Sequence, residues 1–231
     1  MLSAKPVTLA RTTVTAAAVT HLREEIVRGG LKAGDALPES RVGELLGVSR
    51  APAREALTIL EREGLIAFDR RGTARVCRFG LEEVRELGLM RLALEPLAAR
   101  LAAERRPAPE ITAIEKNLQE LKASSRLEDI TRFDLDFHRL VVTATGNTRL
   151  VAAWGNLASQ FLLVMTRLHR VWNQKTRAVR ETTARAHAEL FRAVRSGLPV
   201  EAESIALRHA TAWLSELEQS KAFAAKSEDA E

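Results

Sequence analysis

The sequence predicts a mainly helical chain in two parts: three helices followed by two short strands, and then an antiparallel bundle of six helices. The composition favours helix, because Ala, Leu, Arg and Glu are abundant and strand-forming residues are scarce. The length of 231 residues is enough for two domains that each bury a core. Apolar residues recur at helical spacing from Leu81 onward, and the strand candidates are confined to residues 65–77.

The first part is expected over residues 13–78 and begins with an amphipathic helix that Gly29-Gly30 ends. Two shorter helices follow within residues 37–64. Between them, Gly47 suits the left-handed conformation of a helix end, and Ser49 is a good N-cap for the next helix. The apolar faces of the three helices consist of Val19, Leu22, Ile26 and Val27; of Val42, Leu45 and Leu46; and of Ala53, Ala56, Leu57 and Leu60.

Two short strands are expected at residues 65–68 and 74–77, joined by a turn at residues 69–73. Three helices followed by a basic two-stranded wing form a winged helix-turn-helix. Arg50 and Arg54 lie near the start of its second short helix, which in this motif enters the major groove of DNA. The alternative is a solvated helical hairpin, since arginine-flanked helices are common.

The charge distribution agrees with DNA binding by the first part. Residues 1–78 carry 13 Lys and Arg against 9 Asp and Glu, whereas residues 79–231 carry 22 against 21. The single cysteine, Cys77, excludes an internal disulfide and suits a reducing cytoplasm. Residues 1–12 lack a signal-peptide core, and no apolar run reaches the roughly 18 residues of a membrane span. Residues 1–12 and 222–231 are expected to be flexible tails.

The second part is expected over residues 81–221, after a boundary at Arg78-Phe79-Gly80. Its helices are expected at residues 81–104, 110–123, 126–145, 148–172, 176–196 and 199–220. Pro96 falls inside the first of them and is expected to kink it. In an antiparallel bundle, side chains from facing helices can build a central site. The aromatic residues of this part are expected in its core or at an interface; they include Trp154, Phe161 and Trp172.

Four polar residues accompany the apolar faces of three of these helices. Asp134 and His138 lie four residues apart beside one face, and His187 and His209 each lie in line with another. Each has a simpler interpretation when considered alone. Asp134 and His138 would form an ion pair on the helix surface, and His187 and His209 would be core histidines that are hydrogen-bonded to carbonyls. Together they suit a divalent transition metal, because buried polar groups are costly unless they satisfy one another. For the other two histidines, His21 and His169, the sequence predicts no comparable polar neighbours.

Arg91 lies on an inward-facing apolar stripe, where an apolar residue is expected. A buried arginine needs an anion. The partner is either a glutamate of a neighbouring helix or a ligand carboxylate, which a guanidinium can hold with two bonds. A third possibility is that the side chain snorkels to solvent.

The runs GGLKAGDALPESRVGELLGVSRAPAREAL and LEREGLI resemble the DNA-binding domain of GntR-family bacterial transcription regulators. The resemblance implies that Arg41 and Ser49 meet phosphates, and that Arg50 and Arg54 enter the major groove, where arginine recognises guanine. It also implies that Gly72, at the tip of the wing, approaches the minor groove. Family members usually carry a larger or hydroxyl residue where this chain has Ala51, so the base preference there does not carry over.

Residues 81–220 resemble the all-helical FCD effector domain of one branch of that family, through the runs RLALEPLAARLAA and FDLDFHRLVVTATGN. The resemblance implies a metal site at a D-x-x-x-H segment plus one histidine from each of the last two helices. It further implies that Arg91 binds a small organic acid, and Asn147 is expected to cap a helix end. The implied ligands are Asp134, His138, His187 and His209, and the ion is zinc, nickel or manganese.

The function expected is that of a cytoplasmic, ligand-responsive regulator of transcription, more readily a repressor than an activator. It is expected to bind a pseudo-palindromic operator in double-stranded DNA as a homodimer, because one recognition helix reads only a few base pairs. One alternative is a regulator for which the metal ion itself is the signal. A metal-dependent enzyme is disfavoured, because Glu189 lies two residues from His187 and therefore on another side of the helix.

Overall fold

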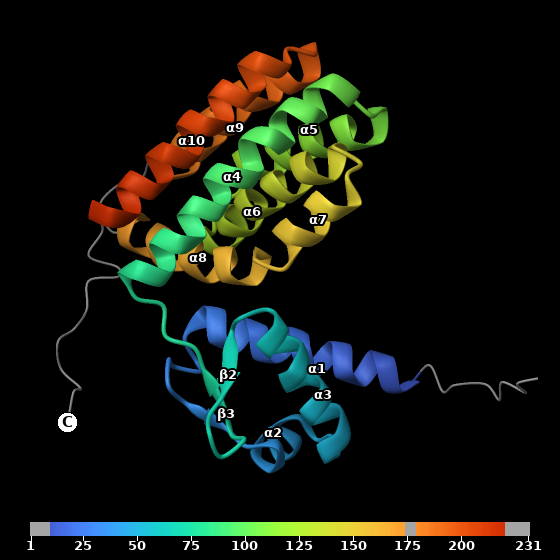
Figure 1. The fold of residues 1–231 in the computed structure, drawn as a ribbon, viewed down its shortest axis with the longest axis vertical. Helices are drawn as coiled ribbons and strands as arrows, with labels where there is room; N and C mark the ends of the chain where they lie inside the picture. Colours follow the sequence, from blue (N-terminus) through green and yellow to red (C-terminus); the bar gives the residue numbers. More distant parts are fainter. Residues whose placement is uncertain (1–9, 174–178, 220–231) are drawn as a thin grey trace, which may run out of the picture. The chain divides into compact units, whose positions relative to one another are not determined.

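The computed structural model describes residues 10–173 and 179–219, which fall into two compact units that divide between Arg78 and Phe79. The tails expected at the two ends lie almost entirely outside the described residues. Each unit is mainly helical, and the first adds a small sheet, so the expected fold class is confirmed (Figure 1).

The first unit contains helices α1 (Ala10–Arg28), α2 (Glu39–Leu46) and α3 (Arg50–Arg62) and strands β1 (Ala36–Leu37), β2 (Ile66–Phe68) and β3 (Ala74–Val76). The sheet is antiparallel with the order β1-β3-β2, and Ile66 pairs with Val76. Strand β1 was not expected, because two residues show no alternation. Arg23 of α1 donates two hydrogen bonds to Glu63, of 2.6 and 2.9 Å, and so ties α1 to the end of α3.

The turn between α2 and α3 has the expected backbone but differs in its side chains. Gly47 adopts φ +64°, which confirms the left-handed helix end. Ser49 occupies the N-cap position of α3, yet its side chain makes no capping hydrogen bond. Leu45 is 59% exposed instead of buried, so Val42 supplies the buried contact of α2. A helix of eight residues is too short for its apolar spacing to show which side faces the core.

The second unit contains α4 (Leu81–Arg105), α5 (Ala108–Ala123), α6 (Leu127–Ala144), α7 (Thr148–Gly155), α8 (Ala158–Asn173), α9 (Val179–Ser196) and α10 (Pro199–Gln219). Within the described ranges these are seven helices, one more than predicted, because residues 148–172 form two helices. The turn after Gly155 brings Trp154 and Phe161 together, with ring centroids 5.7 Å apart. Both rings are buried, as expected, whereas the side chain of Trp172 lies outside the described residues.

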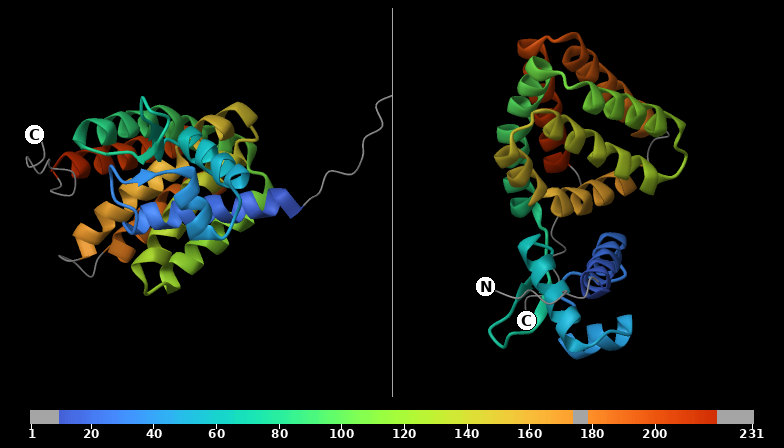
Figure 2. Two further views of the ribbon diagram at one scale, coloured as in Figure 1. Left: turned by 90° about the horizontal axis from the view of Figure 1, so that it is seen from below. Right: turned by 90° about the vertical axis from the view of Figure 1, so that its right-hand side faces the viewer.

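Helices α4 and α10 lie side by side along much of their length, and α5 lies against α6 and α9 (Figures 1 and 2). Helix α4 continues without interruption through Pro96, which is buried. Asn147 caps α7, as expected, by accepting hydrogen bonds from the amides of Arg149 and Leu150. The helices enclose a core that brings inward-facing side chains of α4, α6, α9 and α10 together. Among the described residues, no helix is long and apolar enough to span a membrane.

Candidate nucleic-acid interface and metal centre

The basic residues predicted to meet DNA lie on the surface of α2 and on the exposed side of α3. The side of α3 that holds Ala53, Ala56 and Leu57 is fully buried against the unit. Arg50 and Arg54 are both exposed, near the N-terminus of the helix. The two other predicted contacts in this region, Arg41 and Ser49, are also exposed. The positive end of the α3 dipole lies at Ser49, which suits a phosphate.

Arg54 has an acidic neighbour. Its Nε atom lies 3.5 Å from Oε1 of Glu39, the first residue of α2. The Arg54 side chain is 75% exposed, so this pair is weak and leaves the guanidinium accessible.

The wing is a tight turn organised by Asp69. Its Oδ1 accepts hydrogen bonds from the amides of Arg71 and Thr73, and its Oδ2 accepts one from Arg75 Nε. The amide of Thr73 and the Arg75 guanidinium hold the pKa of Asp69 below its usual value. At the tip, Gly72 is exposed with φ +76°, a conformation that favours glycine.

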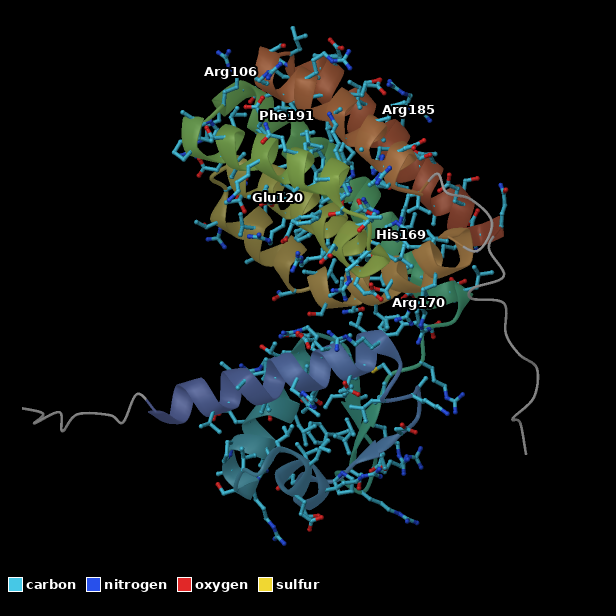
Figure 3. The ribbon with its side chains drawn as sticks, turned by 180° about the vertical axis from the view of Figure 1, so that it is seen from behind. Arg106, Glu120, His169, Arg170, Arg185 and Phe191 are labelled. Carbon is cyan, nitrogen blue, oxygen red and sulfur yellow. The ribbon has the colours of Figure 1, made fainter. Side chains whose placement is uncertain are left out.

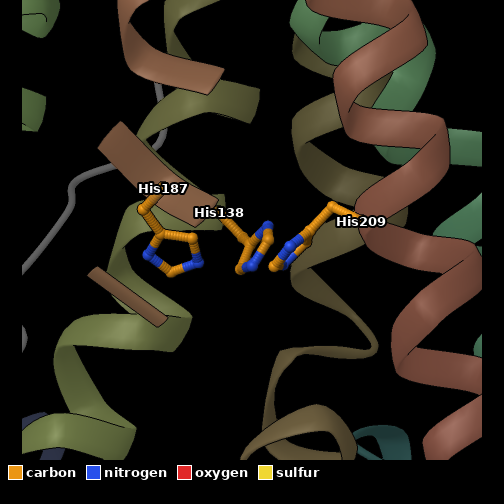
Figure 4. Close-up of side chains that lie close together, drawn as sticks. All are labelled: His138, His187 and His209. Carbon is orange, nitrogen blue, oxygen red and sulfur yellow. The ribbon is translucent and has the colours of Figure 1, made fainter. Parts of the chain in front are cut away.

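Three of the predicted metal ligands meet at one point in the second unit. His138 of α6, His187 of α9 and His209 of α10 each offer a ring nitrogen, and the three nitrogens lie within 4.8 Å of one another (Figure 4). The ring centroids are 5.0 to 5.4 Å apart. The three imidazoles lie on the apolar faces of three different helices, and the packing of these helices brings them together.

Asp134 completes this cluster from the same helix as His138. Its Oδ1 lies 3.1 Å from His187 Nε2 and 3.7 Å from His138 Nε2. Its Oδ2 lies 3.3 Å from Nε2 of His169, on α8. Burial alone would raise the pKa of Asp134, but the contacts with His138, His169 and His187 hold it well below its usual value. The prediction that His169 has no polar neighbours of this kind was therefore wrong.

A buried network of hydrogen bonds surrounds His138. Its Nδ1 lies 3.2 Å from Oε2 of Glu95, and its Nε2 lies 3.0 Å from Nη2 of Arg91. Arg91 can only donate, so the ring nitrogen of His138 nearest to its Nη2 atom must present a lone pair to it. Burial is the largest single effect and lowers the pKa of His138, but Glu95 and Asp134 together outweigh it and raise the pKa overall. Burial would raise the pKa of Glu95, but Arg91 and His138 lower it overall.

His187 and His209 are kept neutral by burial, which lowers the pKa of both and does so strongly for His209. The ring of His187 is stacked on Phe137, with centroids 4.0 Å apart and an interplanar angle of 7°. Neither nitrogen of His187 has a hydrogen bond with a described residue, and its approach to Asp134 lacks hydrogen-bond geometry. A neutral imidazole with an uncommitted lone pair is the form that binds a metal ion.

Arg91 is 1% exposed, which excludes the snorkelling alternative. Its Nε and Nη2 atoms donate to the two oxygens of Glu95, at 2.9 Å each. The anion is therefore a glutamate of its own helix, one turn further on, and not one of a neighbouring helix. Its Nη1 atom is buried and has no partner among the described residues, and the guanidinium carbon lies 4.4 Å from the Trp213 ring centroid.

The donor set fits a divalent transition metal. Three imidazoles and one carboxylate are ligands that zinc and related ions accept, and all four side chains are largely removed from water. The rival acid, Glu189, instead makes a 2.7 Å ion pair with Arg208.

Three further residues belong to this site and were not predicted from the sequence: Glu95, His169 and Thr131, whose hydroxyl oxygen lies 2.9 Å from His169 Nδ1. Glu95 lies four residues after Arg91, a spacing that predicts an i,i+4 ion pair and could have identified it. No comparable signal marks His169, because its approach to Asp134 depends on the packing of α8 against α6.

Comparison with known proteins supports both units. The family model for bacterial regulatory proteins of the gntR family matches residues 14–76, and the FCD domain model matches residues 86–212. The structure of Escherichia coli McbR/YncC has the same fold, with a TM-score of 0.71 and 20% sequence identity, over 89% of this chain and 97% of that one.

Several curated relatives are regulators of transcription. The HTH-type transcriptional regulator YdhC of Bacillus subtilis is 30% identical over 82% of this chain and 84% of its own. The gluconate operon transcriptional repressor of Bacillus subtilis is 31% identical over 64% of this chain and 63% of its own. A probable D-xylose utilization operon transcriptional repressor of Paenarthrobacter nicotinovorans is 27% identical over 89% of each chain.

These families and relatives are regulators and not enzymes, which confirms that part of the prediction. Helix-turn-helix, wing and helical unit all match in order along one chain. The chain belongs to the GntR family of bacterial transcription regulators and is a DNA-binding regulator whose second unit is an FCD domain.

Proposed function

We propose that this regulator is a repressor whose FCD unit binds a divalent metal ion and a small carboxylic acid, and that the acid lowers its affinity for operator DNA. The observation that carries the proposal is the convergence of His138, His187 and His209 beside the buried carboxylate of Asp134. Relatives that are named repressors support the sign of the response.

At the DNA, Arg50 and Arg54 read base edges in the major groove, and Arg41 and Ser49 hold phosphates. The exposed arginines at the N-terminus of α3 support this assignment. The positive φ of Gly72 lets the wing tip present backbone without a side chain to the minor groove. The chain acts as a homodimer on a pseudo-palindromic operator, because a two-fold pair of α3 helices doubles the number of bases read.

In the FCD unit, Asp134, His138, His187 and His209 hold the ion. Zinc suits this set best, and nickel and manganese are the other candidates. Such an ion supplies a Lewis-acidic centre to which a carboxylate oxygen can bind. The ion and Arg91 Nη2 require the same lone pair of His138 Nε2, so occupancy of the metal site and the position of Arg91 are coupled.

Arg91 is the second anchor for the acid. Glu95 accepts the hydrogen bonds from Nε and Nη2 of Arg91. A ligand carboxylate could therefore bind the buried Nη1 atom without displacing Glu95. One relative is named for the gluconate operon, and gluconate carries a carboxylate of this kind. By linkage, an acid that binds the DNA-free form more tightly weakens DNA binding by the same factor.

Metal analysis of the purified protein tests the metal site. We expect about one zinc ion per chain in the wild type and loss of that ion in His187→Ala and His209→Ala. A thermal-shift screen of small carboxylic acids should show stabilisation of the metal-loaded protein only. If the wild type neither retains nor takes up metal, the four residues are a polar core cluster and the metal proposal fails.

A second candidate function is metal sensing, which the full burial of His187 favours, because an ion held on every side has little room for a ligand. The two candidates differ in the binding of operator DNA. For a metal sensor, operator affinity follows the free metal concentration without any acid. For an acid sensor, operator affinity at constant metal changes only when the acid is added.

A further inference from the structure

His169 and Thr131 form a buried row of polar contacts behind Asp134. His169 projects from α8 into the helical unit (Figure 3) and is 2% exposed. Its Nε2 atom lies 3.3 Å from Asp134 Oδ2, and its Nδ1 atom lies 2.9 Å from the hydroxyl oxygen of Thr131. Thr131 lies on α6, one turn before Asp134, so the row runs from α6 to α8 and back to α6.

The direction of the protons in this row follows from what each group can donate. A carboxylate oxygen can only accept, so an N–H at Nε2 of His169 suits the 3.3 Å approach to Asp134 Oδ2. The Thr131 hydroxyl donates its one proton to the carbonyl of Leu127, at 2.9 Å, and this bond holds the threonine in place on its helix. Its oxygen faces Nδ1 of His169.

The two oxygens of Asp134 therefore have different roles. Oδ2 faces His169, whereas Oδ1 faces His187 Nε2 at 3.1 Å and His138 Nε2 at 3.7 Å. A carboxylate fixed through one oxygen can offer a metal ion only the other. Groups that hold a metal ligand from behind set its orientation and its basicity.

We infer that His169, supported by Thr131, is a positioning residue that makes Asp134 a ligand through Oδ1 alone. This inference rests on the proposed metal site, and it assigns a role to a histidine outside the ligand set. With one oxygen of Asp134 committed, three imidazoles and Oδ1 give four donors, the usual number for zinc. A ligand carboxylate would then be a fifth donor on zinc, or would fill the remaining octahedral positions of nickel or manganese.

The test compares four variants of the full-length protein with Zn²⁺ and Co²⁺ as the probes. His169→Ala removes the contact with Asp134, His169→Gln restores an N–H donor near the same position, and Thr131→Val removes the hydroxyl with little change of volume. Leu168→Ala is the matched control, because it truncates the neighbouring fully buried side chain of α8. Zinc affinity is measured by competition with a chelator, and each variant's melting temperature is measured without metal.

We expect His169→Ala to weaken zinc binding by roughly 10- to 100-fold, as for other residues that support a metal ligand. Thr131→Val should weaken it less, and His169→Gln should recover most of the loss. The visible absorption of bound Co²⁺ should change in His169→Ala, because the released Oδ2 can also coordinate the ion. Leu168→Ala should lower the melting temperature without changing either metal measurement.

Two results would overturn the inference, and they are distinguishable. If the wild type binds zinc and His169→Ala binds it equally well with an unchanged Co²⁺ spectrum, His169 is only a structural bridge between α6 and α8, and the metal proposal stands. If the wild type binds neither ion, the proposed metal site and the role of His169 both fall.

Discussion

The guanidinium of Arg91 and the carboxylate of Glu95, one turn apart on α4, face each other through two hydrogen bonds of 2.9 Å in the interior of the FCD unit. Glu95 also accepts a hydrogen bond from Trp154 Nε1 and lies beside His138. Glu95 thus links Arg91, which we propose binds the carboxylic acid, to His138, which we propose binds the metal ion. It also lets a full positive charge remain buried next to three imidazoles.

Loss of Glu95 should destabilise the protein strongly. Glu95→Gln keeps the shape of the side chain but leaves Arg91 buried without its counter-charge, which costs about 3–5 kcal/mol in comparable buried pairs. Urea unfolding measures the change in the free energy of unfolding. The double variant Arg91→Met with Glu95→Gln should recover much of the loss, because no charge then remains buried. A Glu95→Gln protein as stable as the wild type would show that Arg91 has another counter-charge.

Arg54→Ala should strongly weaken specific operator binding and leave the FCD unit folded, because Arg54 is exposed near the N-terminus of α3. Loss of one bidentate arginine contact costs about 1–3 kcal/mol of discrimination between bases. Footprinting measures the operator complex, and circular dichroism measures the fold. The control is Arg62→Ala, which removes an exposed arginine from the last turn of the same helix. An unchanged footprint for Arg54→Ala would show that another residue reads the bases.

The wing should loosen at low pH and in Asp69→Ala. Because hydrogen bonds lower the pKa of Asp69 in the folded state, its stabilising contribution is present above the unfolded pKa of about 3.9 and is lost as the pH falls through the folded value. NMR can follow the amides of Arg71 and Thr73, which should shift on acidification in the wild type. In Asp69→Ala these amides should lack the transition, and operator affinity at neutral pH should fall. Identical titrations in both proteins would exclude this role.

Phe137→Leu should weaken metal binding by releasing the stacked ring of His187. The substitution should also cost roughly 1–3 kcal/mol of stability, from lost buried volume and from the lost ring contact. Phe191→Leu is the control, since Phe191 is buried in the same core cluster and its ring centroid lies 5.3 Å from the guanidinium carbon of Arg195. The measurement that distinguishes the two variants is the amount of metal that each retains after dialysis against a chelator. Equal retention in both variants would show that the stack does not orient His187.

The sequence was sufficient for most of the fold because the relevant signals are local. Glycine at position 47 and helical spacing on either side predict the helix-turn-helix, and both depend on residues that are neighbours in the chain. The signals failed where elements were short or where two helices shared one apolar pattern. Strand β1 has two residues, and the turn after Gly155 interrupts a run whose apolar spacing continues on both sides.

For the candidate site, the sequence by itself determined which residue types face inward: Asp134, Arg91 and the three histidines of the proposed metal set. Helical periodicity fixes the face on which a side chain lies, and that property depends on residues a few positions apart. Only the tertiary structure decided that Glu95 of α4 meets His138 of α6, and that one oxygen of Asp134 faces His169 of α8. These contacts depend on the distances between packed helices, to which residues far apart in the sequence contribute, so no local pattern contains them.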